Sequence, residues 1–219
     1  MKKKNKKQKE MSNGLRIGIF TVIIIIVISL IGFGAYKLLS DTSDEDAPKV
    51  LKKNEVVISG YGIYIDDSDT DLYREEFNKL RDNIESKKIN YDEYAASVAK
   101  MFIIDLYTIK NKINKYDIGG VDFVYKSALD NYKDNVTDTI YKYVEDNTNG
   151  DRTQQLPVVK NVSVTNVEKS KYKIESENKE YNAYKFRLSW SYSINLGYDT
   201  SGEVIVINKD NKMYVVEKN

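Results

Sequence analysis

The sequence predicts an α+β protein in which a single N-terminal transmembrane helix precedes three helices packed on a curved antiparallel sheet. Three observations predict this class. An uncharged apolar run lies near the N-terminus, apolar residues recur with helical spacing through the middle of the chain, and alternation of apolar and polar residues follows Pro157. Helices that come first and strands that come last are typical of α+β domains, in which helices cover one face of a sheet.

The uncharged run from Ile17 to Tyr36 has the length of a transmembrane helix. Its 20 residues would span about 30 Å, the thickness of the hydrocarbon core of a bilayer. A cleaved signal peptide has a shorter apolar region and a cleavage site of small residues, and the stretch Gly32-Phe33-Gly34 matches such a site poorly. We therefore assign residues 17–39 to a membrane helix.

The charges on either side of this helix give its orientation. The first 16 residues carry seven positive charges and one glutamate, which is a net charge of +6, whereas four acidic residues lie between positions 41 and 46. Basic residues stay on the cytoplasmic side of membrane helices. The sequence thus predicts a cytoplasmic tail (1–16), a flexible linker (40–55) and one extracytoplasmic domain (56–219) in the cell membrane.

Composition excludes several classes of function. The chain has no cysteine and no histidine, so disulfides, thiol nucleophiles, thiolate metal sites and imidazole bases are all absent. The whole chain carries +1, so the part after the basic tail carries −5, which disfavours binding to nucleic acid. We expect no metal, no cofactor and no nucleic-acid partner. The abundance of Lys, Asn, Ile and Tyr fits an AT-rich genome, as in a Gram-positive bacterium.

An acidic run at residues 66–71 precedes the first predicted helix. The run does not match the pattern of an EF-hand calcium loop, because Leu72 stands where glycine is needed and Asn78 stands where a bidentate glutamate is needed. Capping of the helix by Asp69 or Thr70 accounts for the same residues.

Three helices are predicted from apolar residues that recur every three or four positions. The first spans about residues 70–87. The second opens at Asn90, which has the residue type of an N-cap, and its apolar stripe extends to Ile113 before a glycine-rich turn. The third carries its apolar positions from Val124 to Tyr143.

The clearest predicted strand runs from Tyr184 to Leu196, where apolar and polar residues alternate at every position. Such alternation indicates one face on a core and one in water, as in an antiparallel sheet. We expect Phe186, Leu188 and Trp190 to lie in the core. The other strand segments are 158–167, 172–174, 204–207 and 213–216.

This layout resembles the membrane-anchored NTF2-like proteins, and it is similar to the VirB8-like and TcpC-like scaffold subunits of bacterial conjugation machines. The resemblance covers the order of elements over the whole chain and rests on no diagnostic motif, so it transfers no functional residue. It implies a cone-shaped fold, self-association and a structural role in an envelope complex. A cystatin-like fold is the alternative for the same order of elements.

Two sets of residues are candidates for a functional site. Asp105 lies beside the apolar stripe of the second helix, where a carboxylate in an apolar pocket can act as an acid or base; a surface position or a hydrogen bond from a tyrosine is the structural alternative. Tyr181, Tyr184, Tyr192 and Tyr198 are candidates for a pocket or contact surface, because tyrosine combines apolar area with a polar tip.

The sequence therefore favours a non-enzymatic, membrane-anchored scaffold or interaction protein of a bacterial envelope complex, with conjugation or secretion as the process. Its expected partners are the membrane, other envelope proteins and a second copy of the chain. An extracytoplasmic binding module for a small apolar ligand or a cell-surface polymer is the alternative. An NTF2-like enzyme that uses Asp105 is the third hypothesis.

The charge asymmetry predicts a testable topology. Protease added to intact protoplasts should remove the C-terminal domain and spare the N-terminal tail, because the basic tail is held in the cytoplasm. The measurement is immunoblotting for tags at both ends, with lysed protoplasts as the control. Survival of the C-terminal tag in intact protoplasts would contradict the orientation.

Overall fold

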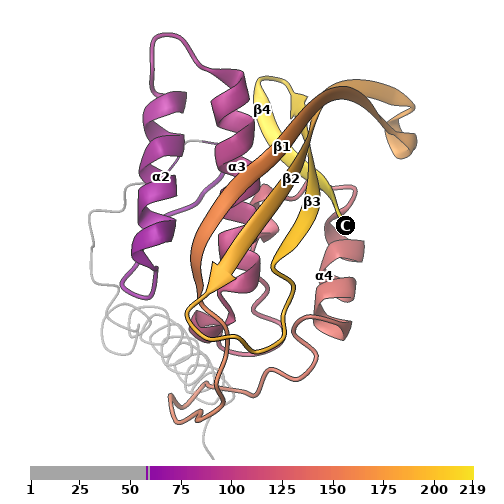
Figure 1. Cartoon of the computed structure of the whole chain (residues 1–219). Coiled ribbons are helices and arrows are strands. Elements are labelled where there is room, and N and C mark those ends of the chain that lie inside the picture. The colour runs from indigo at the N-terminus through magenta and orange to yellow at the C-terminus, as the bar shows by residue number, and fades with distance from the viewer. Residues whose placement is uncertain (1–57, 59) are drawn as a thin grey trace, which may run out of the picture. The chain divides into compact units, whose positions relative to one another are not determined.

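Helices precede strands in the part of the chain that the computed structural model describes, which is residue 58 and residues 60–219 (Figure 1). The predicted tail, membrane helix and linker lie outside the described residues. None of the described helices is both long enough and apolar enough to cross a bilayer. The helices are α2 (Asp71–Ile84), α3 (Tyr91–Tyr107) and α4 (Leu129–Asp138), and the strands are β1 (Val159–Ile174), β2 (Lys179–Tyr192), β3 (Ser201–Lys209) and β4 (Lys212–Lys218). Three 3₁₀ turns complete them: η1 (Ile109–Asn111), η2 (Val121–Phe123) and η3 (Glu175–Glu177).

Polar side chains cap the first two of these helices, as the sequence predicts. The Thr70 hydroxyl accepts a hydrogen bond from the backbone N–H of Tyr73 at 3.2 Å. The Asn90 side chain accepts from the N–H groups of Asp92 and Glu93. Each cap satisfies N–H groups that the first turn of a helix leaves without an internal partner.

The second helix ends at Tyr107, so the prediction that it reaches Ile113 is wrong. Thr108 leaves the helical conformation, and its hydroxyl accepts from the N–H of Val159 at the start of β1. The carbonyl of Pro157 then accepts from the next two backbone N–H groups. These contacts with a distant segment replace the helical hydrogen bonds, and Ile113 is left 51% exposed.

The third helix is also shorter than predicted. Val124, its expected start, forms a parallel β-bridge with Val215 of β4, and the N–H of Tyr125 donates to the carbonyl of Val215 at 2.8 Å. Tyr143, its expected end, is 77% exposed. The apolar spacing in this region is helical, but pairing with the sheet overrides it before Ala128.

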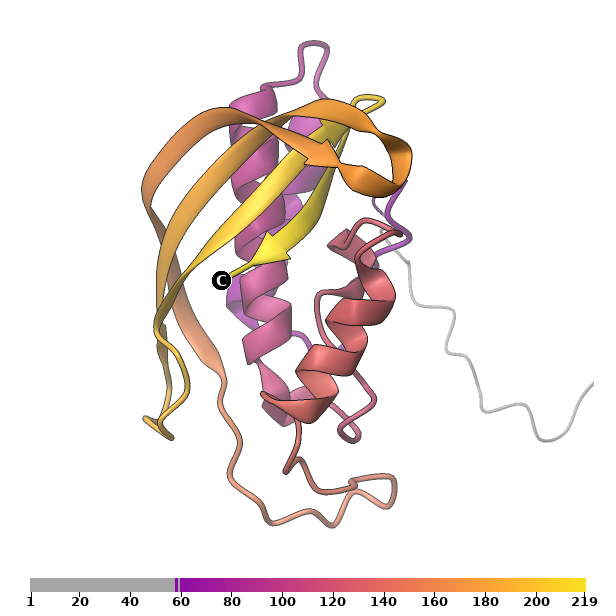
Figure 2. The same ribbon diagram turned by 90° about the vertical axis from the view of Figure 1, so that its right-hand side faces the viewer.

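The four strands form an open antiparallel meander in the order β1-β2-β3-β4, and the sheet is strongly curved (Figure 2). Register shifts interrupt β1 near Asn161 and near Asn166 and mark bulges, which bend strands. The β3–β4 turn places Asp210 and Asn211 at positive φ, as two-residue hairpins require. The tip of the long β1–β2 hairpin curls toward α4.

The main core lies between α3 and one face of the sheet, with α2 packed on α3. Phe186, Leu188 and Trp190 are at most 5% exposed, which confirms their predicted place in the core. The strand itself ends at Tyr192, so its predicted extension to Leu196 is wrong: the N–H of Ser193 donates to Val158, and the chain then leaves the sheet.

A second, smaller core lies on the opposite face of the sheet near the hairpin tip. Tyr181 and Ala183 occupy the positions of β2 that alternate with the main core, and they pack with Tyr125, Ile174 and Ile207. Tyr125 belongs to the segment before α4, so this cluster joins that segment to the hairpin.

Removal of Trp190 should test this core. The Trp190→Ala variant should lose about 3–5 kcal/mol of unfolding free energy, because a large cavity replaces the indole. Chemical denaturation followed by circular dichroism measures the loss. Ser191→Ala, on the exposed face of the same strand, should cost no more than about 0.5 kcal/mol. Equal losses of unfolding free energy from the two variants would contradict the assignment of Trp190 to the core face of β2 and of Ser191 to its exposed face.

Candidate functional site

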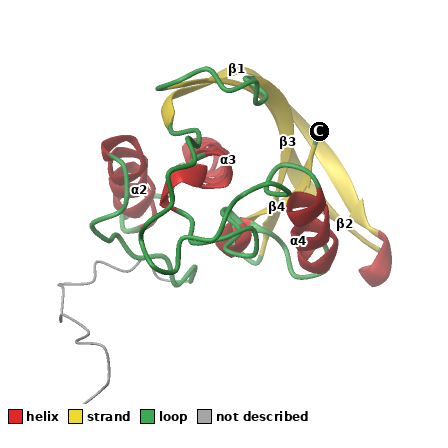
Figure 3. Ribbon diagram, turned by 90° about the horizontal axis from the view of Figure 1, so that it is seen from below, coloured by secondary structure: helices red, strands yellow, loops and turns green. Residues whose placement is uncertain are grey.

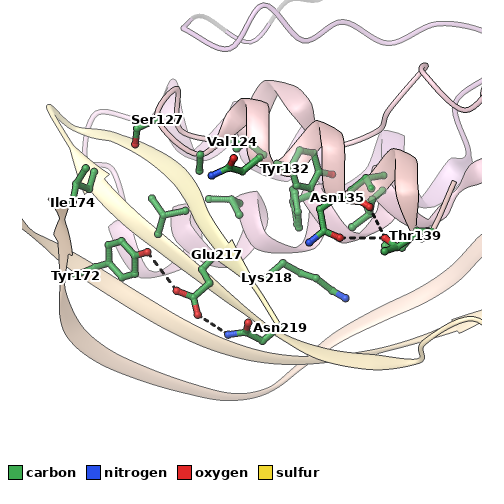
Figure 4. Close-up of a pocket in the computed structure, with 18 of the residues that line it drawn as sticks. Val124, Ser127, Tyr132, Asn135, Thr139, Tyr172, Ile174, Glu217, Lys218 and Asn219 are labelled. Carbon is green, nitrogen blue, oxygen red and sulfur yellow. Dashed lines mark hydrogen bonds between the residues drawn. The ribbon is translucent and has the colours of Figure 1, made fainter. Parts of the chain in front are cut away.

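A cleft of about 820 Å³ lies between α4 and β4, the last strand of the sheet. Its size falls within the range of about 300–1,000 Å³ that is usual for ligand pockets. Phe102 and Leu106 of α3 form part of its apolar floor together with Val215. Figure 3 shows α4 beside the last strands, away from α2, and Figure 4 shows the side chains that line the cleft.

A polar row on α4 forms one wall of the cleft. Asn131, Asn135 and Thr139 are spaced four residues apart, so they lie on one side of the helix, and all three line the cleft. The Thr139 hydroxyl donates to the Asn135 carbonyl oxygen at 2.6 Å. On the neighbouring side of the helix, Val136 is buried in the main core.

An acidic row lies next to this polar row. Asp130, Asp134 and Asp138 share the four-residue spacing and are all exposed. On the helical wheel they follow the polar row on the side of α4 that faces away from the core, and none of the three lines the cleft itself. Lys133 lies on a different side of α4.

The outer edge of β4, which no described segment pairs with beyond Val215, forms the opposite wall. Asn219 and Glu203 of β3 exchange two backbone hydrogen bonds, at 2.8 and 2.9 Å. Because hydrogen-bonded positions alternate along an antiparallel ladder, the backbone N–H and C=O of Lys218 point away from β3. Lys218 lines the cleft, and these two groups face the side of β4 opposite to β3.

The tip of the β1–β2 hairpin, residues 172–176, forms the roof of the cleft. A clasp of Tyr125, Glu177, Tyr181 and Lys209 holds it in place. The carboxylate of Glu177 accepts from Lys209 at 2.8 Å and from the hydroxyl of Tyr181 at 2.5 Å, and it also accepts from the hydroxyl of Tyr125. The hydrogen bond from Lys209, followed by those from the two tyrosines, lowers the pKa of Glu177 to about 2.

Asp199 closes one end of the cleft. Its carboxylate accepts from the Tyr107 hydroxyl at 3.1 Å and lies 3.5 Å from the ammonium of Lys218. Its backbone carbonyl accepts from the hydroxyl of Tyr192 at 2.5 Å, and that hydroxyl in turn accepts from the indole N–H of Trp190. These hydrogen bonds fix the loop after β2 to the core.

The structure does not bring the four candidate tyrosines together. Tyr181 belongs to the clasp, and Tyr184 points to the opposite face of β2, where its hydroxyl donates to Asp92 at 3.0 Å. Tyr192 and Tyr198 lie edge to face near the Asp199 end of the cleft. None of the four lines the cleft itself.

Asp105 holds two segments of the chain together. Its carboxylate accepts from the Lys112 ammonium at 2.5 Å and from the backbone N–H of Gly120 at 2.6 Å. A Cβ at Gly119 would lie 2.1 Å from the backbone oxygen of Asp105, so only glycine permits this close approach. The carboxylate thus fixes the turn that leads from α3 toward α4.

The space around Asp105 is separate from the cleft. It is bordered by Asp69, Tyr73 and Asn111 among others, and it has no room for a water molecule. Burial raises the pKa of Asp69 and of nearby Asp122. The residues that the structure describes contain no group of three or more acidic side chains arranged to hold a metal ion.

The residues that form the cleft are not among those predicted from the sequence. The sequence contains a signal for the polar row of α4, because Asn131, Asn135 and Thr139 repeat every four residues beside an apolar row. It contains no signal for the contribution of β4, since the cleft depends on which strand is the last in the sheet. The tyrosines in and after β2 instead led to the prediction of a pocket or contact surface there.

These features define an α+β domain with an open four-stranded antiparallel sheet and a cleft between its last described helix and its last strand. No known protein family, no curated protein and no solved structure matches the chain.

The clasp predicts a dependence of stability on pH. The folded state lowers the pKa of Glu177 from the ordinary value of 4.5 to about 2, so the clasp stabilises the fold above pH 4.5 and this contribution is lost as the pH falls toward 2. Unfolding free energies measured from pH 2 to 7 should therefore show a gap between wild type and Glu177→Gln that narrows in acid. Glu175→Gln, in the same turn but outside the clasp, is the control. A gap that stays constant with pH would contradict the clasp.

Proposed function

We propose that this chain is a non-enzymatic, membrane-anchored interaction protein of a bacterial envelope complex, and that its C-terminal domain binds a protein partner in the cleft between α4 and β4. The observation that carries the proposal is the cleft itself, which combines an apolar floor, a polar helix row and a strand edge that no described segment covers beyond Val215. Strand edges and helix grooves are recurring modes of peptide recognition.

The charged groups near the cleft favour contact over catalysis. Asp199 is engaged by Tyr107 and Lys218, and Glu217 accepts from Asn219 at 2.6 Å. An acid–base site needs a titratable group that faces the substrate with a second polar group nearby. Asp105, the candidate acid or base, is engaged outside the cleft, so an enzyme built on it is the weaker hypothesis.

The membrane anchor and the layout support a scaffold role. A basic tail and an apolar run of 20 residues precede the domain, and an anchored domain has a raised effective concentration toward other membrane subunits. A curved meander with a cleft between helices and sheet is also the arrangement that the NTF2-like resemblance implies. We therefore propose an NTF2-like scaffold on the extracytoplasmic side, with conjugation or secretion in a Gram-positive bacterium as its process.

A second candidate function is the binding of a small apolar ligand or a cell-surface polymer. The volume of the cleft, about 820 Å³, and its floor of Phe102, Leu106 and Val215 favour it. Native mass spectrometry of the purified full-length protein tests this candidate, because a bound ligand adds a defined mass that denaturation removes.

Photo-crosslinking in living cells tests the scaffold proposal. A photoreactive amino acid in place of Ser127, which lines the cleft, should give discrete adducts with another envelope protein or a second copy of the chain. The same amino acid in place of Lys133, on a different side of α4, is the matched control and should give none of these adducts. Identical adducts from both positions, or no protein adduct from the cleft position, would contradict the proposal.

A further inference from the structure

We propose that the cleft takes an extended, basic peptide segment, which adds as a further strand to the free edge of β4 and places its lysine or arginine side chains against the acidic row of α4. The inference rests on the proposed interaction function and names the class of its partner. Backbone hydrogen bonds would provide affinity, and charge would provide selectivity.

The backbone of β4 is the first reason. The ladder with β3 directs the N–H and C=O of Lys218 away from β3, as the paired hydrogen bonds of Asn219 with Glu203 establish. The segment from Val215 to Asn219 borders the cleft, with a register shift at Val216, and spans at most about 13 Å at roughly 3.3 Å per residue. An extended segment of about four residues matches this length.

The second reason is that another segment of the chain already pairs with this edge of β4. Val124 and Tyr125 already pair with β4 at Val215, so an extended chain fits against this strand. The chain then turns away at Ala128, whose N–H donates to the carbonyl of Tyr125, and α4 begins. The edge beyond Val215 therefore faces the cleft, and a bound peptide would continue the line of the Val124–Tyr125 segment.

Protection of the edge is the third reason. An uncovered strand edge on an open surface pairs readily with other copies of the chain and promotes aggregation. Here α4 and the roof of the cleft flank the edge. A single extended segment can enter from the open side, whereas α4 obstructs the edge of a second sheet. The amides of Asn131 and Asn135 on the opposite wall can bond to the outer edge of the peptide.

Charge complementarity selects a basic segment. Asp130, Asp134 and Asp138 form a row of three exposed carboxylates on α4, next to the polar row that lines the cleft, and within the described chain no lysine or arginine forms an ion pair with any of them. The cleft itself is lined by three carboxylates, those of Glu175, Asp199 and Glu217, and by the ammonium groups of Lys173 and Lys218. Each lysine lies near a carboxylate, Lys173 near Glu175 and Lys218 near Asp199. The excess of carboxylates in the cleft and on α4 attracts cationic side chains and repels acidic ones.

Binding of defined peptides to the full-length protein in a neutral detergent tests the inference. The test peptide is an N-acetylated, C-amidated hexapeptide of alternating lysine and valine, labelled for fluorescence anisotropy and measured at about 0.15 M salt, where distant charges are screened. It should bind at least about tenfold more tightly than the matching glutamate–valine peptide. Equal binding of the two peptides, or binding of neither, would overturn the inference.

Blocked backbones test the strand addition. Two further lysine–valine peptides carry N-methyl groups on either the odd or the even residues, which removes alternate N–H donors. Because only one set of N–H groups can face β4, at least one of these peptides should bind about tenfold more weakly. Full binding of both methylated peptides would exclude pairing with the strand.

Variants of the protein locate the site. Asn131→Trp should fill the cleft and abolish binding, whereas Lys133→Trp, on a different side of the same helix, should not. A triple change of Asp130, Asp134 and Asp138 to asparagine should weaken lysine–valine binding about tenfold. The matched control changes Asp82 to Asn and Glu85 and Glu168 to Gln, all exposed and away from the cleft. Retained binding by the cleft variants would overturn the assignment.

The two proposals can fail separately. Adducts from the Ser127 position without peptide binding would preserve the interaction function and remove the basic extended segment as its partner. Peptide binding without adducts in cells would preserve the basic extended segment as a ligand of the cleft and contradict the scaffold role.

Discussion

The backbone pairing of Val124 and Tyr125 with Val215 is the constraint on which the arrangement of the cleft depends. It is the backbone pairing that the described residues show between β4 and the segment before α4, and the cleft opens between α4 and β4 beyond it. The turn before this segment is fixed by Asp105, which binds the N–H of Gly120 and thereby sets the path from α3. A half-buried carboxylate and one β-bridge together determine where α4 stands.

The sequence predicted the architecture better than the ends of its elements. Helix starts at Thr70 and Asn90 were predictable because capping depends on local side chains. Helix ends were not, because distant partners decide them: Pro157 and Val159 capture the chain after Tyr107, and β4 captures Val124. Periodicity describes which residues are apolar, and it cannot show which backbone groups find a partner elsewhere.

The candidate site was predicted less well, for a related reason. Tyr181 and Tyr184 are three residues apart, and the alternation of a strand sends them to opposite faces. Asp105 stood out as a carboxylate in an apolar stretch, and the structure engages it with Lys112 and Gly120. The cleft brings α4 together with the last strand, and only the order of strands in the sheet reveals that meeting.

The walls of the cleft lie far apart in the chain, with Asn135 on one side and Lys218 on the other. Contacts between such distant segments form late in folding, because the intervening chain must first be closed into a loop. α4 leaves the ribosome before β4, so a growing chain has the helix wall without the strand wall. The cleft therefore exists only in a domain whose sheet is finished, and any binding that uses both walls reports the completion of folding.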